Sequence, residues 1–90
     1  MSETTTIKPI IAKIIKGLRL KNKMNQEDLA AACGADRTYI SLIERGKMEP
    51  SLTKIFDLSK ALGITGSQFV RMIELEEMRL KELSGEDIEK

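Results

Sequence analysis

The 90-residue chain contains no histidine, no tryptophan and only one cysteine, and each shortage excludes a class of chemistry. Without histidine, the commonest metal ligand and the commonest general base are both missing. The single cysteine, Cys33, cannot form an intramolecular disulfide, and its apolar surroundings predict a buried, inert thiol. The sequence also has neither a glycine-rich phosphate loop nor a paired-carboxylate cleft. We therefore expect no enzymatic activity, no metal site and no cofactor.

Aromatic residues are scarce as well, at 3% of the chain, whereas apolar residues make up 41%. The core must then come from Ile, Leu, Met and Ala, which suit packed helices better than a β-sandwich. The polar and acidic start, Met1 to Thr6, is unlike a signal peptide, and lysines interrupt the apolar clusters. We expect a cytoplasmic protein with no membrane association.

The spacing of apolar residues predicts five helices joined by short loops. The expected ranges are 9–22, 26–33, 36–45, 52–62 and a longer helix that follows Thr65 and reaches Leu83. Capping residues mark four of the starts: Asn25 with Asp28, Asp36, Ser51, and Thr65 with Gln68. No segment shows the alternation of a strand, so the predicted fold class is all-α.

The most informative stretch is Gln26 to Arg45, which reads QEDLAAACGADRTYISLIER. Two short helices joined by a glycine-containing turn need small residues where they cross, and Ala30, Gly34 and Ala35 supply them. This is the layout of a helix-turn-helix, in which the second helix can enter a DNA major groove.

The same residues resemble the lambda-repressor-like family, in particular its Xre/Cro-type branch. The similarity covers about Ile10 to Phe69. Its motifs are Arg19, NQEDLA at 25–30, DRTYISLIERG at 36–46, PSL at 50–52 and ALGI at 61–64. The resemblance implies a five-helix DNA-binding domain with an extended C-terminal helix. The expected organisation is a flexible lead-in over 1–8, the helix-turn-helix domain over 9–70, and a C-terminal extension and polar tail over 71–90.

The outward face of the expected helix 36–45 carries the candidate base-reading residues. Arg37, Thr38, Ser41 and Leu42 share this face. The Arg37 guanidinium can bond guanine O6 and N7 together, Thr38 and Ser41 can reach base edges or phosphates, and Leu42 can contact a thymine methyl. An ordinary polar surface helix is the alternative interpretation of this face.

A second set of residues is expected to contact DNA phosphates. It comprises Asn25, Gln26, Tyr39, Arg45, Lys47, Ser51 and Lys54. The resemblance implies the anchoring role of Gln26 and of the Tyr39 hydroxyl, although Tyr39 could equally pack as a half-buried aromatic. For each lysine, a solvated surface position is an equal alternative. The resemblance also implies a structural ion pair between Arg19 and Glu44.

The charge distribution and the last helix bear on partners. Residues 1–54 carry 10 basic and 6 acidic side chains, whereas residues 55–90 carry 5 and 8. A basic front half fits one DNA-facing side, although two solvated surfaces would give the same counts.

The last helix has more apolar residues than one small core can cover, so we expect a homodimer with Ile73, Met78 and Leu80 in its interface.

These features predict a transcriptional regulator that binds a palindromic double-stranded operator as a homodimer. The run DRTYIS…IERG resembles the controller proteins of restriction-modification systems, while a phage repressor or a stand-alone regulator remains open. The alternative from another class is an antitoxin-type protein that binds a partner protein as well as DNA.

Overall fold

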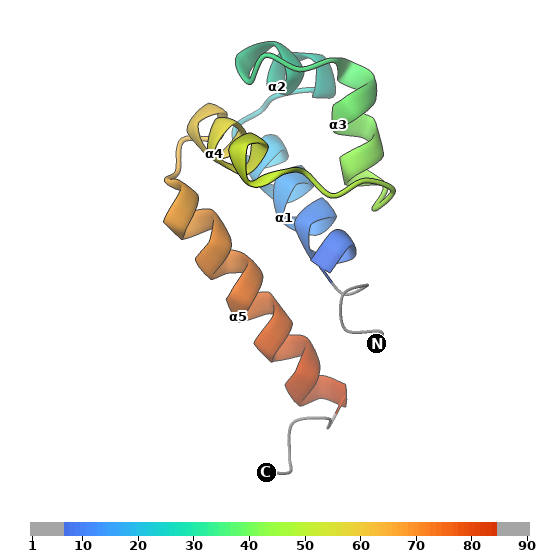
Figure 1. Cartoon of the computed structure of the whole chain (residues 1–90), viewed down its shortest axis with the longest axis vertical. Helices are drawn as coiled ribbons and strands as arrows, with labels where there is room; N and C mark the ends of the chain where they lie inside the picture. The colour runs from blue at the N-terminus through green and yellow to red at the C-terminus, as the bar shows by residue number, and fades with distance from the viewer. Residues whose placement is uncertain (1–6, 85–90) are drawn as a thin grey trace.

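All five predicted helices are present in the computed structural model, which describes residues 7–84 (Figure 1). They are α1 (Ile7–Lys21), α2 (Gln26–Ala32), α3 (Arg37–Glu44), α4 (Leu52–Ala61) and α5 (Gly66–Ser84). Residues 7–84 contain no strand, which confirms the all-α fold class. No helix in this range is both long and apolar enough to cross a membrane.

The first helix begins earlier than expected. The lead-in was predicted to extend to Lys8, but α1 already includes Ile7, and the rest of the lead-in lies outside the described residues. Pro9 is compatible with this start because the first turn of a helix does not use its N–H groups in internal hydrogen bonds.

Two predicted capping boxes are confirmed. The Asn25 side chain accepts a hydrogen bond from the Asp28 N–H at 2.7 Å, and Asp28 accepts one from the Asn25 N–H at 2.9 Å. Thr65 and Gln68 exchange the equivalent pair at 2.9 and 3.1 Å. Asp36 differs from its prediction, because it has the extended backbone of an N-cap but its side chain makes no capping hydrogen bond.

The turn between α2 and α3 depends on Gly34, whose φ of +68° lies in the left-handed region. The Ala35 N–H then bonds back to the Ala30 carbonyl at 2.8 Å, which closes the end of α2. The chain therefore changes direction within a few residues and presents α3 beside α2.

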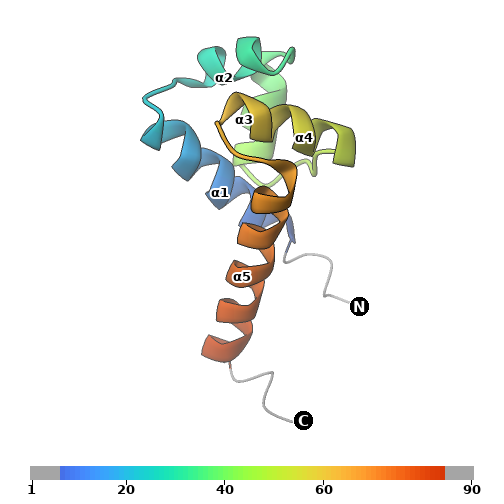
Figure 2. The ribbon, with the colours of Figure 1, turned by 90° about the vertical axis from the view of Figure 1, so that its left-hand side faces the viewer.

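Helix α1 lies at the centre of the molecule, between α3 on one side and α5 on the other (Figure 1). Figure 2 shows α5 continuing beyond the other helices, in agreement with overall dimensions of 44 × 22 × 22 Å. The core is formed by Ile10, Ile11, Ile14, Ile15, Leu29, Ala30, Cys33, Ile40, Ile43, Ile55, Leu58, Leu62 and Phe69. Burying each large side chain is worth about 1.5–3 kcal/mol, so this shared core fixes how the short helices α2 and α3 are held.

Candidate nucleic-acid interface

The recognition-helix candidate, α3, is attached to the core by two side chains and exposes the opposite face. Ile40 and Ile43 are fully buried. Arg37 and Thr38 in the first turn are exposed, and so is Arg45 just after the last turn. Within residues 7–84, the Arg37 guanidinium has no hydrogen-bond or ion-pair partner, so its donors are available to an external ligand.

The middle of this face is less exposed than the sequence suggested. Ser41 and Leu42 are half-buried. The Ser41 carbonyl also accepts a hydrogen bond from Arg45 Nε at 3.4 Å, which lays the Arg45 side chain back along α3. The four predicted base-reading residues thus share one face, but Arg37 and Thr38 project furthest from it.

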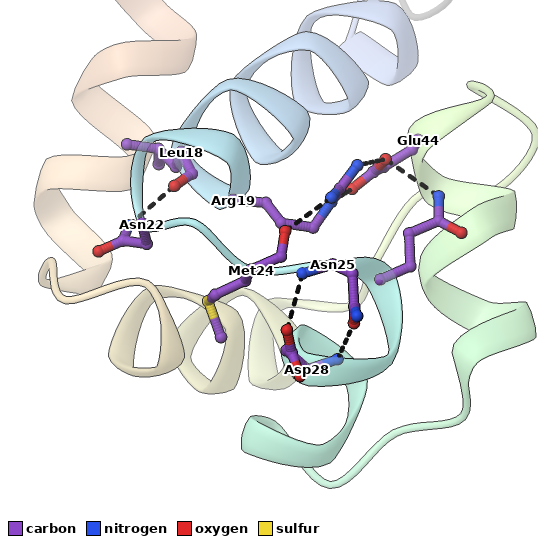
Figure 3. Close-up of polar contacts among 8 residues, drawn as sticks. Leu18, Arg19, Asn22, Met24, Asn25, Asp28 and Glu44 are labelled. Carbon is purple, nitrogen blue, oxygen red and sulfur yellow. Dashed lines mark hydrogen bonds and ion pairs between the residues drawn. The ribbon is translucent and has the colours of Figure 1, made fainter.

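An ion pair between Arg19 of α1 and Glu44 of α3 fixes the orientation of α3 (Figure 3). The Arg19 guanidinium donates to both carboxylate oxygens of Glu44, at 2.6 and 3.0 Å, and to the Met24 carbonyl at 2.8 Å. The two side chains retain only 9% and 4% of their exposure. A bidentate ion pair that is almost completely buried from solvent joins two helices with defined geometry.

The protonation states of this pair follow from the same contacts. Burial opposes ionisation of Glu44, but hydrogen bonds from Arg19 and Gln26 and the Arg19 charge outweigh it and lower the pKa of the Glu44 carboxyl. The hydrogen bond to Glu44 raises the pKa of Arg19. Both groups therefore remain charged at neutral pH.

Gln26 and Asn25 make hydrogen bonds inside the protein in addition to their predicted phosphate contacts. Gln26 Nε2 donates to Glu44 Oε1 at 3.1 Å, which links the start of α2 to the end of α3. Asn25 caps α2. A polar hollow of about 500 Å³ lies beside them, lined by Arg19, Asn25, Gln26, Glu27 and Arg37. The structure thus brings the start of α2 and the first turn of α3 to the same hollow.

Lys54 and Tyr39 form a contact that the sequence analysis missed. Lys54 Nζ lies 5.9 Å from the centre of the Tyr39 ring, 3.5 Å from the Cys33 carbonyl oxygen and 3.8 Å from the Asp57 carboxylate. Burial raises the pKa of the Tyr39 hydroxyl and of the Cys33 thiol. Both Tyr39 and Lys54 are half-buried, so Lys54 connects α4 to the helix-turn-helix. No local pattern signals the contacts with Tyr39 and Cys33, because these residues lie 15 and 21 positions before Lys54 in the chain.

The loop before α4 carries the remaining two phosphate candidates. Lys47 is exposed, and within the described part of the chain its ammonium has no ion-pair partner. Ser51 is exposed too, and its hydroxyl accepts the N–H of Lys54 at 3.1 Å as the cap of α4. Among the three predicted phosphate-contacting cations, Arg45, Lys47 and Lys54, Lys47 therefore makes the fewest side-chain contacts within residues 7–84.

A family model described as helix-turn-helix matches residues 15–69. The chain belongs to the helix-turn-helix family. The match includes α2, α3 and α4 completely, and it confirms the resemblance drawn from the sequence motifs.

The relatives of this helix-turn-helix chain include several controller proteins. It is 45% identical to the control protein C.BamHI of Bacillus amyloliquefaciens over 62 residues, which cover 68% of this chain and 76% of the relative. It is 42% identical to C.MunI of a Mycoplasma species, with coverage of 71% and 86%. The crystal structure of the wild-type restriction-modification controller protein C.Esp1396I is 33% identical, with a TM-score of 0.71 and coverage of 80% and 92%.

The same neighbour has also been crystallised on DNA. The C.Esp1396I tetramer in complex with its natural 35 base-pair operator is similar to this chain with a TM-score of 0.73, at 33% identity, over 80% of this chain and 95% of that one.

Proposed function

We propose that this protein is a sequence-specific DNA-binding transcriptional regulator that inserts α3 into the major groove of a palindromic operator. The observation that carries this proposal is the construction of α3. Two fully buried isoleucines and the Arg19–Glu44 pair hold the helix, while Arg37 projects from its first turn without an internal partner among the described residues. The complex of the similar C.Esp1396I with its operator supports binding of this chain to operator DNA.

The physiological role that these relatives support is control of a restriction-modification system. The relatives named as control proteins match this chain over most of their own length. They favour the controller over the antitoxin-type alternative. A regulator of this kind works where the DNA is, in the cytoplasm, and it needs no catalytic group.

Selection of bound DNA from a random duplex library tests the proposed function. We expect one enriched palindrome whose half-sites are centred about one helical turn, roughly 34–36 Å, apart. Binding that is sensitive to salt but indifferent to sequence would contradict it.

A palindrome requires two copies, and the structure separates the three residues predicted for the dimer interface. Ile73 and Leu80 are half-buried and pack partly on the core of their own chain, whereas Met78 is 51% exposed. At 100° per residue, Met78 lies about 140° around α5 from Ile73. One flat interface therefore cannot centre on all three residues.

An alternative centre for the dimer interface is the surface where α4 and α5 meet, beside Ile73. Phe56 is 57% exposed and its ring packs on Gly66, while Val70 is 47% exposed on the same side of α5 as Ile73. Leu52, one turn before Phe56, is exposed as well. We propose that this α4–α5 surface, formed by Leu52, Phe56, Val70 and Ile73, is the centre of the dimer interface, with Leu80 at its edge.

Charge substitutions distinguish the two positions on α5. We expect Val70→Glu to weaken self-association at least tenfold, because it places an uncompensated charge in an apolar contact. Met78→Glu introduces the same group at a similar exposure and should leave self-association unchanged. Sedimentation equilibrium measures both. Dissociation by Met78→Glu alone would place the interface on the outer side of α5 instead.

Lys47→Ala should weaken binding to every DNA sequence by a similar factor. A lysine that contacts phosphate contributes counterion release and no base discrimination. The slope of log affinity against log salt concentration should become shallower by about 1. Titrations of operator and random duplex at several salt concentrations measure this slope, and an unchanged slope would remove Lys47 from the interface.

A further inference from the structure

A groove lies between α1 and α5. Figure 1 shows α5 on the side of α1 opposite α3. It consists of two adjoining hollows of about 560 and 540 Å³, which share Leu18, Lys21 and Met72. Gly17 lines the second of these hollows. The lining includes no residue of α3 and none of the α4–α5 surface. Neither the proposed DNA contact nor the proposed dimer interface therefore accounts for the groove.

The presence of glycine at position 17, in the wall of this groove, has no explanation in contacts within the described chain. It lies inside α1, where glycine is less favourable than any residue except proline. Its φ is not positive, and a Cβ added there would have no neighbour within 4 Å. Gly66 differs, because a Cβ there would meet the Phe56 ring in the position that it now occupies. Nothing within the described chain needs the space beside Gly17, whereas an external backbone approaching α1 closely would use it.

The charges around the groove indicate that a ligand bound there would be acidic. Its lining contains four basic residues, Lys13, Lys21, Arg71 and Arg79, and one acidic residue, Glu76. Lys13 and Arg79 both pair with Glu76, at 2.8 and 2.6 Å. Arg71 pairs with Glu74, which lies outside the lining, at 3.5 Å. The lining together with Glu74 therefore carries a net charge of +2. Leu18, Met72 and Leu75 supply an apolar strip between these charges.

We propose that this groove binds an amphipathic helix with acidic flanks, contributed by a partner protein. The apolar face of such a helix, with residues at i, i+3, i+4 and i+7, would contact the strip beside Gly17 while its carboxylates meet the basic rims. Because α3 lies on the other side of α1, the partner and DNA can be bound at the same time. The protein would then connect an operator to a second protein.

Selection from a displayed peptide library tests this proposal. The library presents 18-residue helices with leucines at i, i+3, i+4 and i+7 and random flanking positions, and the bait is the full-length protein. Peptides that also bind the Gly17→Phe variant are removed by counter-selection, because the added ring would occupy the groove beside position 17. Lys16→Phe is the matched control, because it adds the same ring one residue away on an exposed position outside the lining. Circular dichroism and thermal melting confirm that each variant is folded.

We expect the enriched peptides to be acidic on their flanks. They should bind at least tenfold more weakly to Gly17→Phe and to Arg71→Glu, and equally well to Lys16→Phe. Operator affinity should be unchanged in Gly17→Phe. The proposal is overturned if no peptide prefers the wild type to Gly17→Phe, or if the preferred peptides are basic. Loss of operator affinity in Gly17→Phe would assign the groove to DNA, and loss of self-association would assign it to a second copy of this chain.

Discussion

Glu44→Ala is expected to lower the free energy of unfolding by about 3–5 kcal/mol, which is a large part of the stability of a domain this small. The reason is the Arg19 guanidinium, whose side chain retains 9% of its exposure and would lose both hydrogen bonds to the carboxylate. The substitution leaves the buried Arg19 charge without a counterion, with only the hydrogen bond to the Met24 carbonyl remaining. Urea unfolding followed by circular dichroism measures the loss.

Two further variants test the mechanism of this destabilisation. Replacing both partners by apolar residues, as in Arg19→Met with Glu44→Leu, should recover much of the lost stability, because no isolated charge remains. Gln26→Ala should cost less than Glu44→Ala, since it removes one hydrogen bond and leaves the ion pair intact. An unchanged melting temperature for Glu44→Ala would show that the pair contributes nothing.

The same pair makes stability depend on pH in a defined direction. The pKa of Glu44 is lower in the folded protein than its ordinary value of 4.5, so the stabilisation is present above that pH and is lost as the pH falls through the folded pKa. Glu76 also has a lowered pKa, about 2, because of hydrogen bonds from Arg79 and Lys13. Comparing the wild type with Glu44→Gln separates the two, since only the Glu44 part of the acid dependence disappears.

Arg37→Ala is expected to abolish discrimination at one base pair of each half-site. A bidentate contact between a guanidinium and guanine is worth about 1–3 kcal/mol, and a dimer makes it twice. Arg37 is exposed in the first turn of α3 and has no partner within residues 7–84, so its removal should leave the fold intact. Parallel selections from a random duplex library at fixed salt, with wild type and variant, measure the change.

Arg37→Lys is the informative control for this experiment. It keeps the positive charge but loses the planar pair of donors. If Arg37 reads a guanine, the lysine variant should lose base preference while retaining salt-dependent affinity. Recovery of the same consensus by Arg37→Ala would move base recognition to the other residues on α3.

Local features explain why so much of the fold could be predicted. Capping boxes such as Asn25 with Asp28 act over three residues, and the Gly34 turn depends on a single dihedral angle. Both are therefore visible in the sequence. Asp36 shows the limit of this reasoning, because a residue type that favours capping does not compel the hydrogen bond.

The helices, the helix-turn-helix and the face of α3 that carries Arg37 could all be predicted, because they depend on contacts between near neighbours and on helical periodicity. Tertiary packing determines how far Leu42 is exposed, that Lys54 reaches the Cys33 carbonyl, and that Ile73 packs against the core of its own chain. It also placed Gly17 beside α5, about 50 residues further along the chain, in a basic groove. These features depend on how separate helices pack against one shared core, and the spacing of residues within a single helix carries no information about its distant neighbours.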